Sequence, residues 1–263
     1  MEMGLKGRVA IVAASSHGLG KAVALGLARE GARVALCART ASALEAAADQ
    51  IRSETGAEVL TRAVDVTVHQ QVREFVAAAA KQFGRIDICV ANAGGPPSKS
   101  FAETTLEDWR SATDLNLMST VYFAKETLPL MQQRQWGRFI AITSVAVKQP
   151  IEGLILSNSI RSGVSGLIKT LSNEYGRYGV LVNSVCPGYT ATARLVELSR
   201  RLAAREGVDP AEIVERWGRL TALGRVGRPE EFADTVVFLA SERAGYITGV
   251  SLAVDGGVVK GVY

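Results

Sequence analysis

Short apolar runs alternate with longer amphipathic segments along most of this chain. The runs are apolar at nearly every position, which is typical of strands buried on both faces of a parallel sheet. We expect strands at Val9–Ala13, Val34–Ala38, Val59–Ala63, Ile86–Ala91, Phe139–Thr143, Leu181–Val185 and Ser251–Val254. Between the runs the apolar positions follow helical periodicity. We expect helices over residues 18–30, 41–55, 68–83, 106–134, 154–178 and 229–241.

This alternation of strands and helices predicts an α/β fold with a doubly wound parallel sheet of about seven strands and helices on both faces. One segment, 190–228, has helical character but no strand, and it holds eight arginines and five acidic residues. Long insertions after a strand end are where α/β proteins place covers over a bound ligand. We therefore predict a single domain over residues 1–263, with a substrate lid at 190–228.

Composition narrows the class of protein. The chain is 48% hydrophobic and 21% charged, with a net charge of +4 and no run of five or six basic residues, so we expect no nucleic-acid partner. Cys37, Cys89 and Cys186 lie in apolar stretches without metal-ligand spacing, which predicts buried free thiols in a reducing compartment and no metal site. No signal-peptide pattern and no membrane-spanning apolar run is present, so we expect a cytoplasmic protein without a membrane partner.

A glycine-containing turn follows the first expected strand directly and leads into a helical segment. Such a turn presents backbone N–H groups and a helix N-terminus to a pyrophosphate, and glycine lets the backbone approach closely. The position between strand and helix makes a simple tight turn the weaker interpretation. The turn therefore predicts a Rossmann-type site for a nicotinamide dinucleotide, contacted by Ser15, Ser16, His17, Gly18, Leu19 and Gly20.

The end of the second expected strand bears on the choice of cofactor. Arg39 and Thr40 follow that strand, where NAD-selective sites place an acid for the ribose hydroxyls. Arginine suits a 2′-phosphate, because its guanidinium donates charge-assisted hydrogen bonds to phosphate oxygens. The competing interpretation of Arg39 is a solvated residue that opens a helix. We expect the cofactor to be NADP(H).

With these motifs and others, nearly the whole chain resembles the short-chain dehydrogenase/reductase family, and within it the 3-oxoacyl-acyl-carrier-protein reductases. The C-terminal part of the resemblance rests on Gly224-Arg225, Pro229-Glu230-Glu231, Ile247-Thr248-Gly249 and Asp255-Gly256-Gly257. The resemblance implies a homotetramer and further cofactor contacts at Asp65, Val66, Asn92, Ala93, Gly94, Pro187, Gly188, Thr190 and Thr192. The chain departs from the family at the first cofactor motif, where Ala13-Ala14 replace Thr-Gly.

The resemblance also implies catalytic positions, of which Asn116 and Ser144 match the family. The family places a tyrosine thirteen residues after the serine and a lysine four residues further on. This chain has Ser157 and Arg161 there. Arg161 is suited to holding the nicotinamide ribose but cannot relay protons, and Ser157 is a poor acid.

Two other residues are candidates for the missing proton donor. Lys148 follows Ser144 closely, although an exposed loop lysine is the simpler interpretation. Tyr189 adjoins the nicotinamide segment, although tyrosines after such turns more often pack against a lid.

We expect an NADP(H)-dependent oxidoreductase that reduces a carbonyl in a small-molecule or acyl-thioester substrate, 3-oxoacyl-type or related, with an atypical proton-donor site. Two alternatives stay open. One is a non-catalytic NADP-binding or assembly protein. The other is a non-redox reaction that uses Ser144 and Ser157 on the same scaffold. The latter lacks a histidine base, because His17 and His69 lie elsewhere in the sequence.

Overall fold

The computed structural model describes residues 2–262, and within them seven strands form one parallel sheet in the order β3-β2-β1-β4-β5-β6-β7. The order reverses between β1 and β4, and open α/β sheets bind their ligands beside such a reversal, at the carboxyl ends of the strands. The strands are β1 (Val9–Ala13), β2 (Arg33–Ala38), β3 (Val59–Ala63), β4 (Ile88–Ala91), β5 (Gly137–Ile142), β6 (Val180–Pro187) and β7 (Ser251–Val254).

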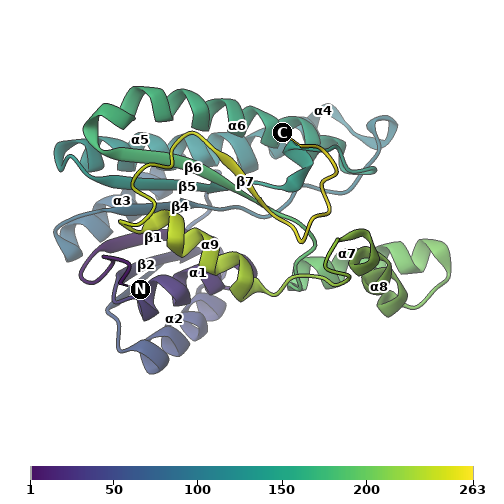
Figure 1. Ribbon diagram of the computed structural model, residues 1–263, viewed down its shortest axis with the longest axis horizontal. Helices are drawn as coiled ribbons and strands as arrows, with labels where there is room; N and C mark the ends of the chain where they lie inside the picture. The colour runs from purple at the N-terminus through teal and green to yellow at the C-terminus, as the bar shows by residue number, and fades with distance from the viewer. Residues whose placement is uncertain (1, 263) are drawn as a thin grey trace.

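Helices cover both faces of the sheet (Figure 1). Helices α1, α2 and α9 lie on one face, and α3, α5 and α6 lie on the other. The described helices are α1 (Gly18–Arg29), α2 (Ala41–Thr55), α3 (His69–Phe83), α4 (Leu106–Thr113), α5 (Ser119–Gln133), α6 (Ile155–Tyr175), α7 (Ala193–Glu206), α8 (Pro210–Leu220) and α9 (Pro229–Ala240). The predicted doubly wound α/β fold is confirmed.

The two-sided burial of the sheet explains why its strands are apolar throughout. Along β1, Ala10 and Val12 pack in the core beneath α1 and α9, whereas Val9 and Ile11 pack in the core beneath α3 and α5. Successive residues of a strand face opposite sides, so a strand covered on both sides has no position for a solvated side chain.

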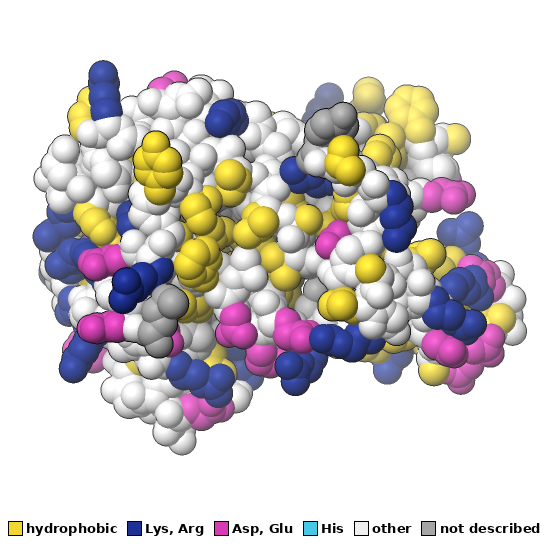
Figure 2. Space-filling model, viewed as in Figure 1, with side chains coloured by type: hydrophobic (Ala, Val, Ile, Leu, Met, Phe, Trp, Pro, Cys, Tyr) yellow, Lys and Arg dark blue, Asp and Glu magenta, His cyan; other side chains and the backbone are white. Residues whose placement is uncertain are grey.

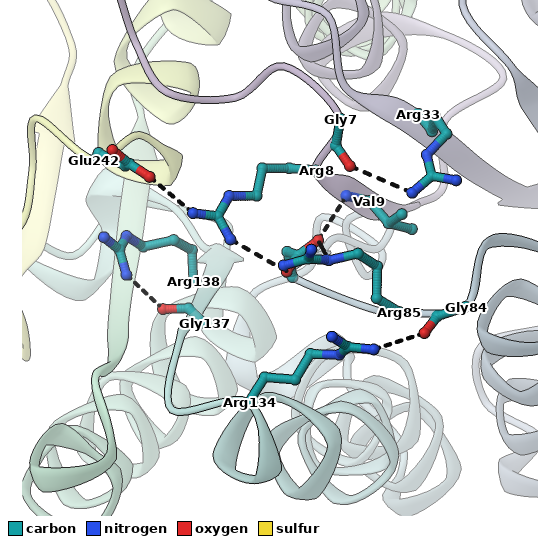
Figure 3. Close-up of polar contacts among 11 residues, drawn as sticks. Gly7, Arg8, Val9, Arg33, Gly84, Arg85, Arg134, Gly137, Arg138 and Glu242 are labelled. Atoms are coloured by element: carbon teal, nitrogen blue, oxygen red, sulfur yellow. Dashed lines mark hydrogen bonds and ion pairs between the residues drawn. The ribbon is translucent and has the colours of Figure 1, made fainter.

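Strand boundaries differ from prediction mainly at the amino ends of the strands. The strand expected from Ile86 begins at Ile88, because Asp87 is buried and forms polar contacts at the amino ends of the strands. The Asp87 carboxylate accepts the Val9 N–H at 2.9 Å and the Arg85 Nε–H at 2.7 Å. Figure 3 shows Val9 and Arg85 among the polar contacts of this region. At the carboxyl ends of the strands, β6 continues to Pro187, so the end of this strand lies on the ligand side of the sheet.

The single helix predicted over 106–134 is wrong in its middle. Helix α4 ends at Thr113, a π-helical turn spans Asp114–Met118, and α5 starts at Ser119. A π-turn holds one extra residue per turn, and such turns occur frequently at functional sites. The apolar periodicity continues through this segment, so the sequence pattern alone did not reveal the interruption.

Residues 190–228 form α7 and α8, which pack against one another and project from the body of the molecule (Figure 1). We call these residues the α7–α8 segment. Its two ends are joined, because Gly227 donates its N–H to the Tyr189 carbonyl at 2.9 Å and accepts the Ala191 N–H at 2.8 Å. Acidic and basic side chains are interspersed on its surface (Figure 2), and four ion pairs within it involve Arg194, Arg201, Arg216 and Arg219. Among residues 2–262 no helix is both long and apolar enough to cross a bilayer.

Candidate functional site

A cavity of about 550 Å³ opens at the carboxyl ends of the central strands. It collects segments that follow four different strands, represented by Ala14 after β1, Asn92 after β4, Thr143 after β5 and Gly188 after β6. The predicted site residues that line it are His17, Gly18, Leu19, Asn92, Ala93, Gly94, Ser144, Ser157, Arg161, Pro187, Gly188, Thr190 and Thr192. The fold therefore brings most of the predicted site together.

The other predicted site residues do not line the cavity. Ser15 is fully buried and donates its N–H to the Cys37 carbonyl at 3.1 Å, which fixes the turn to β2. Ser16 contacts the His17 ring nitrogen through its hydroxyl at 2.9 Å. Gly20 lies in the first turn of α1, and Asn116 lies behind the cavity in the π-turn. Arg39, Thr40, Asp65 and Val66 stand beyond the cavity, after β2 and β3.

The turn between β1 and α1 has little space for side chains. A Cβ atom on Gly20 would lie 2.4 Å from the Ala14 carbonyl oxygen, so only glycine fits there without movement. Gly18 has a φ of +56°, in the left-handed region that favours glycine. Ala14 has a φ of +48°, so an alanine adopts the left-handed conformation where the resembling family has glycine.

The start of the α7–α8 segment lies over this turn. A Cβ atom on Gly18 would be 3.5 Å from Cγ2 of Thr192, which places the two segments in near contact across the cavity. Thr192 is the N-cap of α7, and its hydroxyl accepts the Leu195 N–H at 3.4 Å. A ligand in the β1–α1 turn is thus faced by the N-terminus of a second helix, which favours a negative charge there.

Arg39 stands exposed at the end of β2 and makes no ion pair with another residue of 2–262. The charge of Arg39 acts on the carboxylate of Asp65. The N–H and hydroxyl of Thr67, at 2.9 and 2.7 Å from the Asp65 carboxylate, together with the charge of Arg39, hold the pKa of Asp65 below its ordinary value. Arg39 therefore keeps its guanidinium available to an anion.

Arg161 is buried and reaches across two strand ends from the second turn of α6. Its Nη1 donates to the carbonyls of Ile142 and Thr143 at 3.0 and 3.1 Å, and Nη2 donates to the Gly94 carbonyl at 3.2 Å. Burial lowers the pKa of Arg161 to about 10, so the guanidinium remains charged at neutral pH. The side chain joins the ends of β4 and β5 at the floor of the cavity.

Asn116 shares the same acceptor. Its Nδ2 donates to the Gly94 carbonyl at 2.9 Å, whereas its buried Oδ1 has no partner among residues 2–262. The Asn116 backbone carbonyl accepts the Thr120 hydroxyl at 3.0 Å. The π-turn, the β4 end and Arg161 thus form one connected group centred on Gly94.

The two serines lie at the cavity wall. The Ser144 hydroxyl oxygen accepts the Ala146 N–H at 3.1 Å, which leaves its own proton free to donate toward the cavity. Ser157 is 7% exposed, and its hydroxyl has no hydrogen-bond partner among the described residues although it borders the cavity. Both hydroxyls are able to donate to an oxygen placed between them.

The two alternative proton donors, Lys148 and Tyr189, lie in different surroundings. Lys148 is exposed and is absent from the cavity wall, in agreement with the interpretation of a loop lysine. Tyr189 borders the cavity, but its ring stacks on Trp217 of α8 with centroids 5.3 Å apart, and burial raises the pKa of its phenol. Packing against the α7–α8 segment thus describes Tyr189 better than proton donation.

Free cysteines Cys37, Cys89 and Cys186 are all buried, as expected. Burial raises the pKa of the Cys37 thiol to about 12 and also raises the pKa values of the Cys89 and Cys186 thiols. None of them is a ready nucleophile, because a thiol reacts as its thiolate.

The sequence analysis missed the C-terminal tail. Val258, Val259 and Lys260 line the cavity opposite the sheet, and the Lys260 N–H donates to Gln149 Oε1 at 3.0 Å. The tail turns back through Gly256 and Gly257, whose φ values are +63° and +80°. That glycine pair was the available signal of a reversal, but nothing in it indicated where the tail would lie.

Comparisons with known proteins agree with this site. A family model described as "Enoyl-(Acyl carrier protein) reductase" matches residues 13–259. A short chain dehydrogenase/reductase of Aspergillus oryzae is 33% identical over 97% of this chain and 95% of its own length. The 3-oxoacyl-[acyl-carrier-protein] reductase of Aquifex aeolicus is 31% identical over 98% of this chain and 100% of its own length.

The solved structures give the same result. L-Sorbose reductase from Gluconobacter frateurii, crystallised with NADPH and L-sorbose, superposes with a TM-score of 0.95 at 33% identity, with each chain covered completely. The Rossmann-type sheet and these relatives together define a dinucleotide-dependent oxidoreductase. The chain belongs to the short-chain dehydrogenase/reductase family, as its motifs indicated.

Proposed function

We propose that this protein is an NADP(H)-dependent oxidoreductase that reduces the carbonyl group of a small-molecule or acyl-thioester substrate, 3-oxoacyl-type or related. The observation that carries the proposal is the cavity itself, in which the β1–α1 turn, the β4 end and Ser144 border one space. The reductases that resemble the chain over its whole length support the same activity.

The residues present fit the cofactor. The close approach of the backbone at Gly18 and Gly20 and the two helix N-termini suit its pyrophosphate, and the unpaired Arg39 suits a 2′-phosphate. Asp65 and Val66, which follow β3, would contact the adenine. Gly94, Gly188, Thr190 and Thr192 would border the nicotinamide half, where NADPH supplies the hydride for reduction.

The chain's own residues then orient the substrate. Ser144 donates its free hydroxyl proton in a hydrogen bond to the carbonyl oxygen, and Ser157 gives a second such bond. Asn116 and Arg161 fix the Gly94 carbonyl and the strand ends on which this geometry depends. We assign no proton transfer to Arg161, because its charge is held by three carbonyl acceptors.

The α7–α8 segment serves as the substrate lid in this proposal. Leu195, Leu198 and Leu220 present an apolar wall from this segment to the cavity, and its two ends are joined to each other by the bridge between Thr190 and Gly227. The segment also bonds to the rest of the chain, for example from Arg194 Nη2 to the Pro96 carbonyl at 3.1 Å, but such bonds lie outside the sheet, so the segment can move without disturbing the sheet. The ion pairs on its surface make it a solvated face and not an open basic patch.

We also propose the finer properties that the family resemblance implies, a cytoplasmic homotetramer. One feature supports the assembly: β7 is an edge strand and carries Leu252 at 39% exposure, with Val250 at 36% and Tyr246 at 104% nearby in sequence. Apolar side chains on an open sheet edge favour pairing with another chain. Sedimentation measurements would give the number of copies directly.

The test of function has two parts. Titration of the full-length protein with NADPH and NADH, followed by cofactor fluorescence, measures binding without any substrate. Loss of NADPH absorbance with a panel of β-keto thioesters, 1,3-diketones and ketones then measures reduction. Binding without reduction of any carbonyl substrate would favour the non-catalytic alternative, and failure to bind NADPH would refute the proposal.

A further inference from the structure

The start of α6 concentrates positive potential at one place in the cavity wall. This 21-residue helix begins at Ile155 without a side-chain cap, and the N–H groups of Ile155, Leu156 and Ser157 have no acceptor among residues 2–262. Unpaired N–H groups at a helix start carry the positive end of the helix dipole. Leu154 and Ser157 border the cavity, so this end of the helix faces it.

Arg161, one turn further along the same helix, adds a full charge. It is 7% exposed, and no carboxylate of the described residues forms an ion pair with it. Its Nε–H and one Nη2–H remain without acceptors after the three bonds to carbonyls. A buried cation without a counter-ion is costly for a fold, and that cost is reduced when an anion binds beside it.

The other charged side chains of the cavity wall do not offset this potential. Among the described residues that line the cavity there is no aspartate or glutamate, whereas Arg161, Arg194 and Lys260 are present. Burial lowers the pKa of Arg161 most, and the like charge of Arg194 also lowers it. The unpartnered hydroxyl of Ser157 lies between the helix start and Arg161 along α6, and it borders the cavity.

We infer that Ser157, the first turn of α6 and Arg161 form an oxyanion site, which stabilises a negative substrate oxygen in place of protonating it and which therefore also binds the enolates of β-dicarbonyl compounds as stable anions. The inference rests on the proposed function for its reaction but not for its binding. A β-dicarbonyl compound becomes an enolate by losing a proton to solvent, and the site holds the charged oxygen.

The same site accounts for reduction of a bound keto form without a side-chain acid, whereas a bound enolate, whose carbon is electron-rich, accepts no hydride. The carbonyl carbon accepts a hydride from the reduced nicotinamide, which is oxidised, and the electron pair of the C=O π bond moves onto oxygen. The oxygen is held as an alkoxide by the Ser157 hydroxyl and the charge of Arg161. A water molecule then gives this oxygen its proton and leaves as hydroxide, so that no residue of the chain changes its protonation state.

Binding of acetylacetone to the full-length protein, alone and with NADP⁺, tests the site without turnover. The ultraviolet absorbance of the enolate is recorded against pH at saturating protein. We expect the pKa at which the bound diketone becomes an enolate to fall by about one unit or more. At a pH below that pKa, a fall of one unit makes the enolate fraction tenfold larger. Ser157→Ala should reduce the shift, whereas Ser159→Ala, an exposed serine on the same helix, should retain it.

Arg161→Gln should abolish the shift, and if that variant does not fold, Ser157→Ala decides alone. An unchanged enolate pKa, no absorbance change at any diketone concentration, or an equal shift in Ser157→Ala overturns the inference. So does an Arg161→Gln variant that loses NADPH binding but keeps the enolate shift, since Arg161 would then pair with cofactor phosphate. NADPH titration of the same samples tests the proposed function separately.

Discussion

The two halves of the cavity differ in how far their residues depart from the family's sequence pattern. In the cofactor half, the β1–α1 turn keeps Gly18 and Gly20, and the departure at Ala14 is absorbed by a left-handed alanine. In the reaction half, at the start of α6, the proposed site has Ser157 and Arg161 where the resemblance leads us to expect the family's proton donor and its partner, and Arg161 bonds to the strand ends. The cofactor half binds through the shape of its backbone, which accommodates the methyl group of Ala14. The reaction half depends on the side chain that transfers the proton, so a different side chain there means a different way of handling the proton.

The largest expected effect comes from returning the reaction half to the family pattern. Ser157→Tyr with Arg161→Lys should raise kcat/KM on an unactivated aliphatic ketone by about 10²–10⁴, the usual contribution of a general acid. On a 1,3-diketone the gain should be smaller, because the second carbonyl withdraws electrons and stabilises the alkoxide that hydride transfer forms. Steady-state kinetics with both substrates measure the contrast, with both single mutants as controls. Equal gains on the two substrates would contradict the division between the halves.

Arg161→Gln should lower the free energy of unfolding by about 1–3 kcal/mol, because it leaves buried carbonyls without their hydrogen-bond donor. Urea denaturation measures the change. Arg39→Gln is the matched control in the cofactor half, and as an exposed, unpaired residue it should change stability by less than about 0.5 kcal/mol. Similar losses in both variants would mean that Arg161 has no special structural role.

Arg39→Asp should weaken NADPH binding by about 1.5–3 kcal/mol, the range for a hydrogen bond to a charged group, and should leave NADH binding nearly unchanged or improved. Fluorescence titration of both cofactors gives the two affinities. Arg110→Asp makes the same change of charge on the exposed face of α4 and controls for net charge. Equal affinities of the unmodified protein for NADPH and NADH would refute the role of Arg39.

The smallest effect concerns the phosphate turn. Ala14→Gly should raise the free energy of unfolding by about 0.5–1 kcal/mol, because relief of the left-handed strain exceeds the added entropy of the unfolded chain. Ala13→Gly, one residue earlier in buried β1, should instead destabilise the fold. Thermal unfolding without cofactor compares the pair. A loss of stability in Ala14→Gly would show that the turn is not strained.

Much of the fold could be predicted from local pattern. Strands β1, β3 and β7 and helix α2 begin and end at the predicted residues, because a strand buried on both sides and an amphipathic helix each leave a periodic signal. The π-turn around Asn116 left no such signal, because the buried positions on either side of it, Ala112, Ser119 and Phe123, keep the spacing of one continuous helical face. Strand ends moved where a buried polar group such as Asp87 decided the boundary.

The sequence by itself determined the doubly wound sheet, the turn between β1 and α1 and the position of Arg39 after β2, and it is the source of the prediction that Ser157 and Arg161 stand where the family has its tyrosine and lysine. Only the tertiary structure decided what Arg161 does, because its acceptors lie on β5 and after β4, 18 to 67 residues away along the chain. It also brought the C-terminal tail to the cavity and stacked Tyr189 on Trp217. Periodicity and spacing report on neighbours along the chain, whereas a side chain's partners are set by which strand ends the sheet brings together.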